Sequence, residues 1–155
     1  MTVNVKRLLK YLVITLGTGA LSALASGGFE KYADLKKPPL SPPDAVFPVV
    51  WTVLYVLMAV SAYIINGSTE VKERSKALTV FYIQLAVNFM WSVIFFRFGL
   101  FGAAAVWLFM LIIWIISMLR EFAKLDKTAA RLQVFYLIWC VFALYLNIGV
   151  VILNK

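Results

Sequence analysis

Residues 98–119 read FGLFGAAAVWLFMLIIWIISML, which is a run of uncharged residues between Arg97 and Arg120. A helix needs about 20 apolar residues to cross the hydrocarbon core of a bilayer. A helix that is apolar on every side is typical of a lipid or buried environment. Four more uncharged runs of comparable length occur in the chain, at residues 11–29, 45–69, 77–96 and 132–154. These runs predict an all-α membrane protein, a bundle of five transmembrane helices.

The composition supports the same fold class. The chain has 155 residues, is 63% hydrophobic and has a mean hydropathy of +0.91, whereas ordinary globular chains are roughly half apolar. So short a chain cannot bury five such helices in water, and the runs lack the alternation of membrane β-barrel strands. We expect a single transmembrane domain over 1–155, with helices at about 8–27, 44–65, 74–96, 99–119 and 128–153.

Basic residues are distributed unequally between the two ends of the predicted bundle. Ten fall at the N-terminus and in the second and fourth loops, and five fall in the other two loops and at the C-terminus. The positive-inside rule then places the N-terminus inside, and the C-terminus and first loop outside. The net charge of +8 is thus a topology signal that also favours anionic lipids at the inner face. Because it is divided between two faces, we expect no nucleic-acid partner.

The first span has two interpretations. Lys6 and Arg7 precede an apolar run with small residues at 23–25, which resembles a cleavable signal peptide. We favour a retained helix, because Gly19 and Ala23 are four residues apart and such spacing lets helices pack closely in lipid. A retained span with ordinary positive-inside bias favours a bacterial plasma membrane.

The connection at residues 28–43 contains four of the five prolines. Long loops of compact domains often act as lids or binding loops, and a plain linker is the alternative. We expect a stiff lid over the mouth of the bundle, carrying the aromatic ring of Tyr32. At its end, Ser41 and Asp44 are expected to start the second helix, as a capping hydroxyl and as an acid near the positive helix end.

Several kinds of chemistry lack their residues. The chain has no histidine, which excludes His-based metal sites and catalytic triads. The only cysteine, Cys140, lies mid-span and is expected to be a packing residue. No charged residue interrupts a span, which argues against a proton relay or an ion-coupled pump. No conventional catalytic constellation is present.

Amide side chains occur within the spans. Gln84 and Asn88 are four apart on the third span, and Asn147 lies in the fifth. Amides facing lipid are costly, so these should point inward. Hydrogen bonding between helices explains Gln84 fully, whereas Asn88 and Asn147 suit a pocket and such bonding equally well.

The five tryptophans differ in depth. Trp51 and Trp91 lie beneath the predicted lid and Trp139 lies nearer the centre of the bundle, whereas Trp107 and Trp114 are expected to contact lipid or neighbouring helices. An aromatic-lined cavity with a few amides suits a flat, apolar ligand.

Three segments of the sequence resemble one known family. The segments are 38–58, with its proline pairs and Trp51-Thr52-Val53-Leu54-Tyr55; 84–96, with Gln84, Asn88, Trp91 and Phe95-Phe96; and 136–147, with Tyr136, Trp139, Ala143 and Asn147. Together with five spans and a proline-rich first loop, they resemble the translocator protein family, also called tryptophan-rich sensory proteins (TspO/MBR). The sequence departs from the family at Leu40, Ala59 and Phe135, where Trp, Gly and Pro are frequent.

The resemblance implies a five-helix bundle, commonly a homodimer, with one pocket under the first loop. The family binds protoporphyrin IX, haem, benzodiazepine-type and isoquinoline carboxamide ligands and, in some members, cholesterol, and no cofactor is required. Carried over residue by residue, the pocket is expected to consist of Tyr32, Trp51, Tyr55, Asn88, Trp91, Trp139, Ala143 and Asn147. A cholesterol motif at the end of the fifth helix is not supported, since the first basic residue after Tyr145 is Lys155.

Three functional hypotheses follow. The first is a receptor or sensor that binds a tetrapyrrole by stacking and burial, with its carboxylates near Lys36 or Lys37. The second is degradation of protoporphyrin IX in light and oxygen, with Trp51 and Trp139 as catalytic electron donors. The third is passive transport of a porphyrin or sterol. For a homodimer, the small residues Gly19 and Ala23, or Gly102 and Ala103, offer candidate contact faces.

Overall fold

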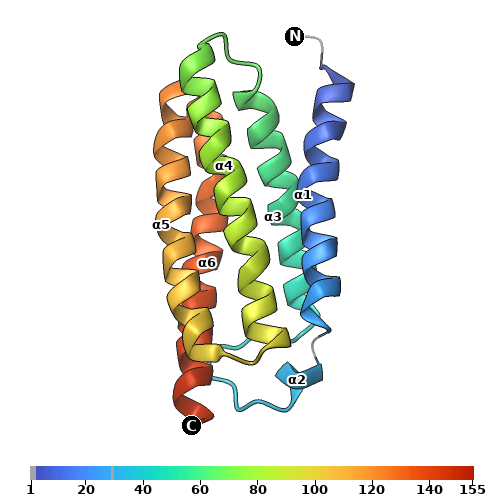
Figure 1. Ribbon diagram of the computed structural model, residues 1–155, viewed down its shortest axis with the longest axis vertical. Helices are drawn as coiled ribbons and strands as arrows, with labels where there is room; N and C mark the ends of the chain where they lie inside the picture. The colour runs from blue at the N-terminus through green and yellow to red at the C-terminus, as the bar shows by residue number, and fades with distance from the viewer. Residues whose placement is uncertain (1–2, 29) are drawn as a thin grey trace.

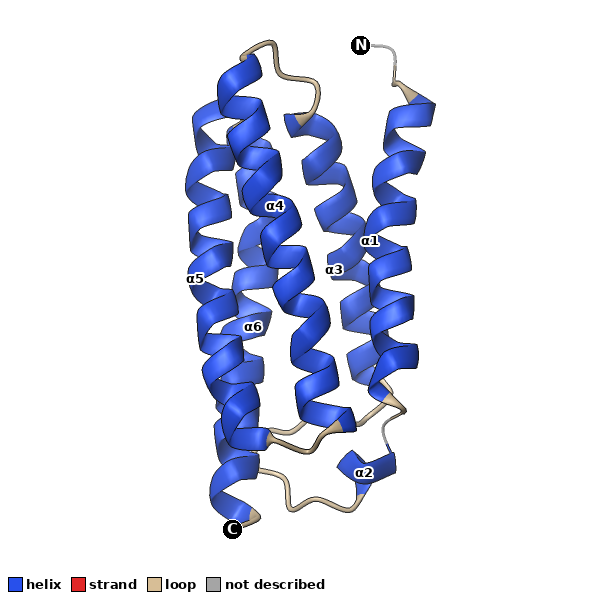
Figure 2. Cartoon of the chain, in the orientation of Figure 1, coloured by secondary structure: helices blue, strands red, loops and turns tan. Residues whose placement is uncertain are grey.

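The computed structural model describes residues 3–28 and 30–155, and is helical throughout apart from its connections. In chain order the elements are α1 (Val5–Ser26), α2 (Glu30–Ala33), α3 (Val46–Ile65), α4 (Val71–Ser92), the π-helical turn η1 (Val93–Arg97), α5 (Phe101–Leu125) and α6 (Lys127–Leu153). Five spans of the described chain, with α4 and η1 as one, are long and apolar enough to cross a membrane. No strand occurs in the part that the structure describes (Figure 2). The predicted all-α, five-span fold is confirmed.

The five long helices form a closed ring (Figure 1). α1 packs on α3 and α4, α3 packs on α6, and α5 lies between α4 and α6. Large side chains such as Met58, Phe81 and Phe122 are fully buried inside the ring. Others, such as Val106 and Phe109, stay exposed on its outer face, as expected for a surface in contact with lipid.

At the end of the bundle away from the lid, α4 and α5 extend beyond their predicted bounds. α5 continues to Leu125, and the fourth loop is reduced to Asp126, whose side chain accepts a hydrogen bond from the backbone N of Ala129 at 2.8 Å and so caps α6. α4 likewise starts at Val71, before the predicted residue 74. Charged residues limit the part of a helix that lies in lipid, but Lys, Arg and Glu are good helix formers. The lengths of the uncharged runs therefore underestimated the lengths of these helices.

The start of α3 corrects another expectation. The helix begins at Val46, two residues later than predicted, and Ala45 at its N-cap position supplies no side-chain hydrogen bond. The Ser41 hydroxyl donates instead to the Pro38 carbonyl oxygen at 2.7 Å, and Asp44 forms an ion pair with Lys37. Both residues thus organise the lid rather than cap the helix.

The end of the third span is a π-helical turn. The predicted helix 74–96 is divided into α4 and η1, and a tight connection through Gly99, whose φ is 66°, leads to α5. π-helical turns are rare and frequent at functional sites. This one carries Phe95 and Phe96, and it positions both rings at the lid end of the bundle.

Candidate ligand-binding site

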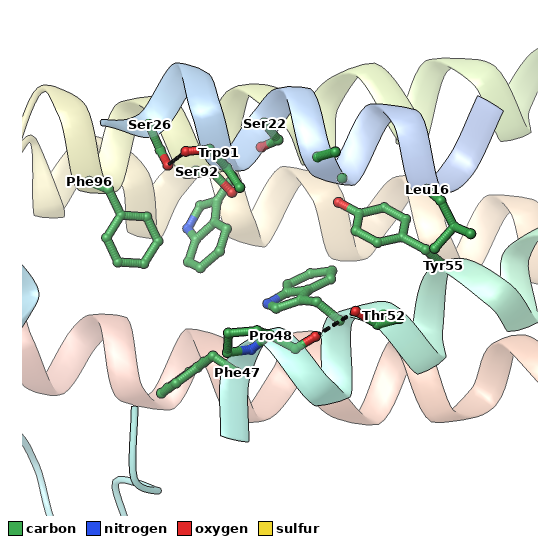
Figure 3. Close-up of a pocket in the computed structure, with 14 residues that line it drawn as sticks. Leu16, Ser22, Ser26, Phe47, Pro48, Thr52, Tyr55, Trp91, Ser92 and Phe96 are labelled. Carbon is green, nitrogen blue, oxygen red and sulfur yellow. Dashed lines mark hydrogen bonds between the residues drawn. The ribbon is translucent and has the colours of Figure 1, made fainter. Parts of the chain in front are cut away.

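A cavity of about 270 Å³ lies between α1, α3 and the end of α4. One wall is aromatic: Trp51 and Tyr55 come from α3, and Trp91 comes from α4. The Trp51 ring centroid lies 5.8 Å from that of Tyr55 and 6.2 Å from that of Trp91. Figure 3 shows Trp91 and Phe96 projecting into the space opposite Phe47. These faces can stack against a flat ring system.

The opposite wall is α1, and its residues are small. A Cβ atom on Gly19 would lie only 2.4 Å from the Tyr55 ring, so only glycine permits this approach of α1 to α3. The Ser22 hydroxyl donates to the Phe89 carbonyl oxygen at 3.2 Å, which fastens α1 to α4. Ala23 lines the cavity and is exposed at its edge, as is Thr52 on α3. The cavity thus opens sideways between α1 and α3.

A second, smaller cavity of about 30 Å³ lies directly under the lid. Tyr32, Ala143 and Asn147 line it, and it shares Trp91 and Phe96 with the larger cavity. The shared side chains form a thin aromatic partition. The structure therefore divides most of the predicted pocket residues between two neighbouring spaces.

Tyr32 fits the predicted role of the lid. Its side chain is 5% exposed, and its ring lies 5.8 Å from Phe47 and 6.0 Å from Phe96. Its hydroxyl is buried without a hydrogen-bond partner. Burial raises the pKa of this phenol, and the charge of Asp44 adds to the increase. The hydroxyl therefore stays protonated at neutral pH and can donate to a ligand in the small cavity.

The lid is fastened to the end of α6 (Figure 1). The Asn154 side chain accepts from the backbone N of Lys36 at 3.0 Å and donates to its carbonyl oxygen at 2.9 Å. Pro38 is buried against Gly149, and the Tyr145 hydroxyl donates to the Pro39 carbonyl oxygen at 2.9 Å. Residue 29, within the predicted lid, lies outside the described residues.

The lysines of the lid are oriented differently from one another. The Lys37 Nζ atom lies 2.8 Å from Asp44 and 4.4 Å from the centre of the Tyr32 ring, whereas Lys36 is exposed. Lys37 is thus already paired with a carboxylate, and Lys36 remains available for an anionic group at the protein surface.

Gln84 and Asn88 share one buried network with Tyr55 and Tyr136. Asn88 accepts from the Tyr55 hydroxyl and donates to that of Tyr136, both at 2.8 Å, and Tyr136 donates to Gln84 at 2.9 Å. Asn88 lines neither cavity, and it holds the floor behind Trp51 in place. The structure also places Tyr136 in this network, a residue that the sequence motif contained but that no chemical argument singled out.

Asn147 combines the two roles that the sequence left open. It accepts from the Trp91 indole N–H at 3.3 Å and donates to the Phe101 carbonyl oxygen at 2.8 Å. It also lines the small cavity. The hydrogen bond fixes the orientation of the Trp91 ring between the two cavities.

Trp139 lies apart from the other predicted pocket residues. It lines a third hollow of about 590 Å³ on the outer face between α3 and α6, together with Val53 and Phe142. Phe47 lies on its inner side, with ring centroids 5.9 Å apart. The motif spacing alone did not reveal that Trp139 lines this hollow between α3 and α6.

Phe47 and Phe96 were missed as pocket residues, although both belong to the motif segments. The available signal was their proximity to the motif aromatics: Phe47 lies four residues before Trp51, and Phe96 directly follows Phe95. Among the described residues, no group of three or more acidic or cysteine side chains could hold a metal ion.

Comparison with known proteins supplies the family. The model of the TspO/MBR family matches residues 11–153. The chain belongs to the TspO/MBR family. It is 37% identical to the tryptophan-rich protein TspO of Chlorobaculum tepidum over 79% of this chain and 78% of that protein. It is 35% identical to the protein CrtK of Rhodobacter capsulatus over 93% and 90% of the two chains.

The similarity extends to animals. The human translocator protein is 33% identical over 77% of this chain and 72% of its own length. In this TspO/MBR member, some of the motif residues line the inner cavities: Trp51, Tyr55 and Trp91 the larger one, and Ala143 and Asn147 the smaller one. Integration in a membrane follows from the family and from the five apolar spans.

Proposed function

We propose that this TspO/MBR member is a membrane receptor for flat, apolar ligands, with the tetrapyrroles protoporphyrin IX and haem as first candidates. The supporting observation is the aromatic wall of Trp51, Tyr55 and Trp91, which faces the small residues of α1 across a narrow space. Benzodiazepine-type and isoquinoline carboxamide ligands would occupy the same space. Binding would rest on stacking and burial, since no charged side chain among the described residues lines the larger cavity.

A tetrapyrrole requires the cavities to join. Their combined volume lies near the lower end of the ligand pockets of proteins, roughly 300–1,000 Å³. The partition consists of side chains, among them Phe96 on η1. Rotation of Phe96 would connect the larger cavity with the Tyr32 hydroxyl and the Asn147 amide. The ligand would then lie along Trp51 and Trp91, with one polar edge under the lid.

The first test is a titration with protoporphyrin IX in detergent, in the dark, followed by tryptophan quenching and by the porphyrin absorption band. Trp51→Ala should weaken binding by about tenfold, because it removes one stacking face. Trp114→Ala is the matched control, since Trp114 lies on α5 and lines none of the cavities described above. Equal affinities of both variants, or no saturable binding by the wild type, would refute the proposal.

Light-dependent degradation of protoporphyrin IX is the second candidate. It is favoured by the ring contacts of Trp51 with Tyr55, Trp91 and Tyr136, because an excited porphyrin in the larger cavity could take an electron from this indole. Trp139 lies behind Phe47 and is the more distant donor. Under illumination, Trp51→Phe should slow the loss of the porphyrin band more than Trp139→Phe. Unchanged bleaching in both variants would refute degradation by these tryptophans, and ligand binding would remain as the proposed function.

A homodimer in a bacterial plasma membrane is part of the proposal. Of the two faces suggested by small residues, α1 uses Gly19 for its contact with Tyr55. Gly102 and Ala103 on α5 are exposed and are the better candidates. Passive porphyrin or sterol transfer has less support, although the sideways opening between α1 and α3 is compatible with it.

A further inference from the structure

The connection between α3 and α4 lies at the end of the bundle opposite the lid (Figure 1), and two arginines contact it. Arg74, in the first turn of α4, donates from Nη1 to the Ser68 carbonyl oxygen at 2.8 Å. Arg7, near the start of α1, lies against the preceding residue, because a Cβ atom on Gly67 would be 3.3 Å from its Nη2 atom. The two guanidinium groups therefore contact neighbouring residues of the connection between α3 and α4.

The orientation of Arg7 is fixed, yet its hydrogen bonding is incomplete. Its Cζ atom lies 4.6 Å from the centre of the Tyr63 ring. The Tyr63 hydroxyl accepts from the backbone N of Asn4 at 3.2 Å, and the Asn4 side chain caps α1 through the backbone N of Arg7 at 3.0 Å. The Nε atom of Arg7 is buried without an acceptor. Buried donors of charged groups almost always have a partner, so an acceptor is expected here.

In the part of the chain that the structure describes, neither arginine has a carboxylate partner. The ion pairs of the described residues are Lys37–Asp44, Lys76–Glu121 and Lys124–Glu121, so neither arginine has a carboxylate within 4.0 Å. Glu70 and Glu73 lie at the start of α4 but point to solvent as exposed residues. Arg7 and Arg74 are both partly buried at this connection, and an anion bound there would compensate their charge. The planar fork of arginine matches phosphate in particular.

We propose that Arg7 and Arg74 form a binding site for the phosphate group of an anionic phospholipid. The site lies where the apolar spans of α1, α3 and α4 end, which is the level of the lipid headgroups. Lys6, Lys10 and Lys72 lie on the same side and add to the attraction for anionic lipid. The site is independent of the ligand cavities, which lie toward the other end of the bundle.

The test measures phosphatidylglycerol retained by the detergent-purified protein, by native mass spectrometry across a lipid titration. The variant Arg7→Lys plus Arg74→Lys keeps the net charge but removes both forks and the buried Nε donor. It should weaken retention of the first lipid by at least about tenfold. The matched control, Lys6→Gln plus Lys72→Gln, lowers the net charge by two but leaves both guanidinium groups intact. It should lose less affinity than the lysine variant.

The opposite order would show diffuse attraction by net charge and would overturn the site. Circular dichroism and gel filtration check that each variant is folded, and Arg74→Lys alone replaces the double variant if that one unfolds. A final titration adds inorganic phosphate. Retention of phosphatidylglycerol in millimolar phosphate supports a lipid site, whereas its displacement would assign the site to a free anion and contradict the lipid source.

Discussion

Gly19 and Gly149 are the glycines at which an added Cβ atom would lie closest to another side chain. Gly19 admits the ring of Tyr55, and Gly149 admits Pro38 of the lid. The spacing of Gly19 and Ala23 correctly indicated close packing in lipid. However, Gly19 faces a neighbouring helix of the same chain, a distinction that spacing alone cannot make.

Substitutions on α1 provide a matched test at this scale. Gly17→Ala adds a methyl group where no atom lies within 4 Å, and it should stabilise the helix by up to about 1 kcal/mol. Gly19→Ala places the same group against Tyr55, and it should destabilise the protein by about 1–3 kcal/mol. Thermal unfolding in detergent measures both. A melting temperature of Gly19→Ala equal to or above that of Gly17→Ala would contradict the close α1–α3 contact.

The position of the lid depends on tertiary contacts with the end of α6. Its prolines predicted a stiff segment, and its position in the sequence placed it beside the mouth. Its attachment to the last turns of α6 joins residues more than a hundred positions apart. Through Tyr32, this attachment also closes the small cavity.

Asn154→Ala removes both hydrogen bonds between the end of α6 and the backbone of Lys36. We expect the lid to open more often, so that trypsin cleaves after Lys36 several-fold faster, at a loss of roughly 1–2 kcal/mol of local stability. Asn66→Ala, at the opposite end, is the control. If both variants resist trypsin like the wild type, Asn154 does not hold the lid.

At the scale of the whole molecule, the basic residues determine the expected orientation. They follow the ends of the helices even where the helices extend beyond the uncharged runs, as in α5 and α6. The lid and the C-terminus lie at one end, and the N-terminus and the α3–α4 connection at the other (Figure 1).

Single cysteines test this orientation in intact bacterial cells. Leu40→Cys in the lid should react with a membrane-impermeant maleimide, since position 40 is 81% exposed. Thr69→Cys in the α3–α4 connection, which is also exposed, should react only after permeabilisation. The native Cys140 is buried and gives little background. Labelling of Thr69→Cys, but not of Leu40→Cys, in intact cells would reverse the predicted topology.

The sequence by itself determined the five spans, the charge asymmetry and the position of the lid. Each of these depends on a property that is local in the chain: the length of an uncharged run, the sign of the flanking charges, or a cluster of prolines. It also placed Trp51 and Trp91 beneath the lid, because each lies a few residues from the same end of its span, whereas Tyr55 was expected only from the family resemblance.

Only the tertiary structure decided how these side chains are divided among the cavities. Whether Trp139 faces inward, and whether Asn88 lines a cavity or holds Tyr55 and Tyr136, depends on the rotation of each helix about its own axis. That rotation is set by contacts between residues distant in sequence, such as Asn88 with Tyr136 and Gly19 with Tyr55. Helices that are apolar on every side carry little periodic signal for it, so packing and buried hydrogen bonds determine it.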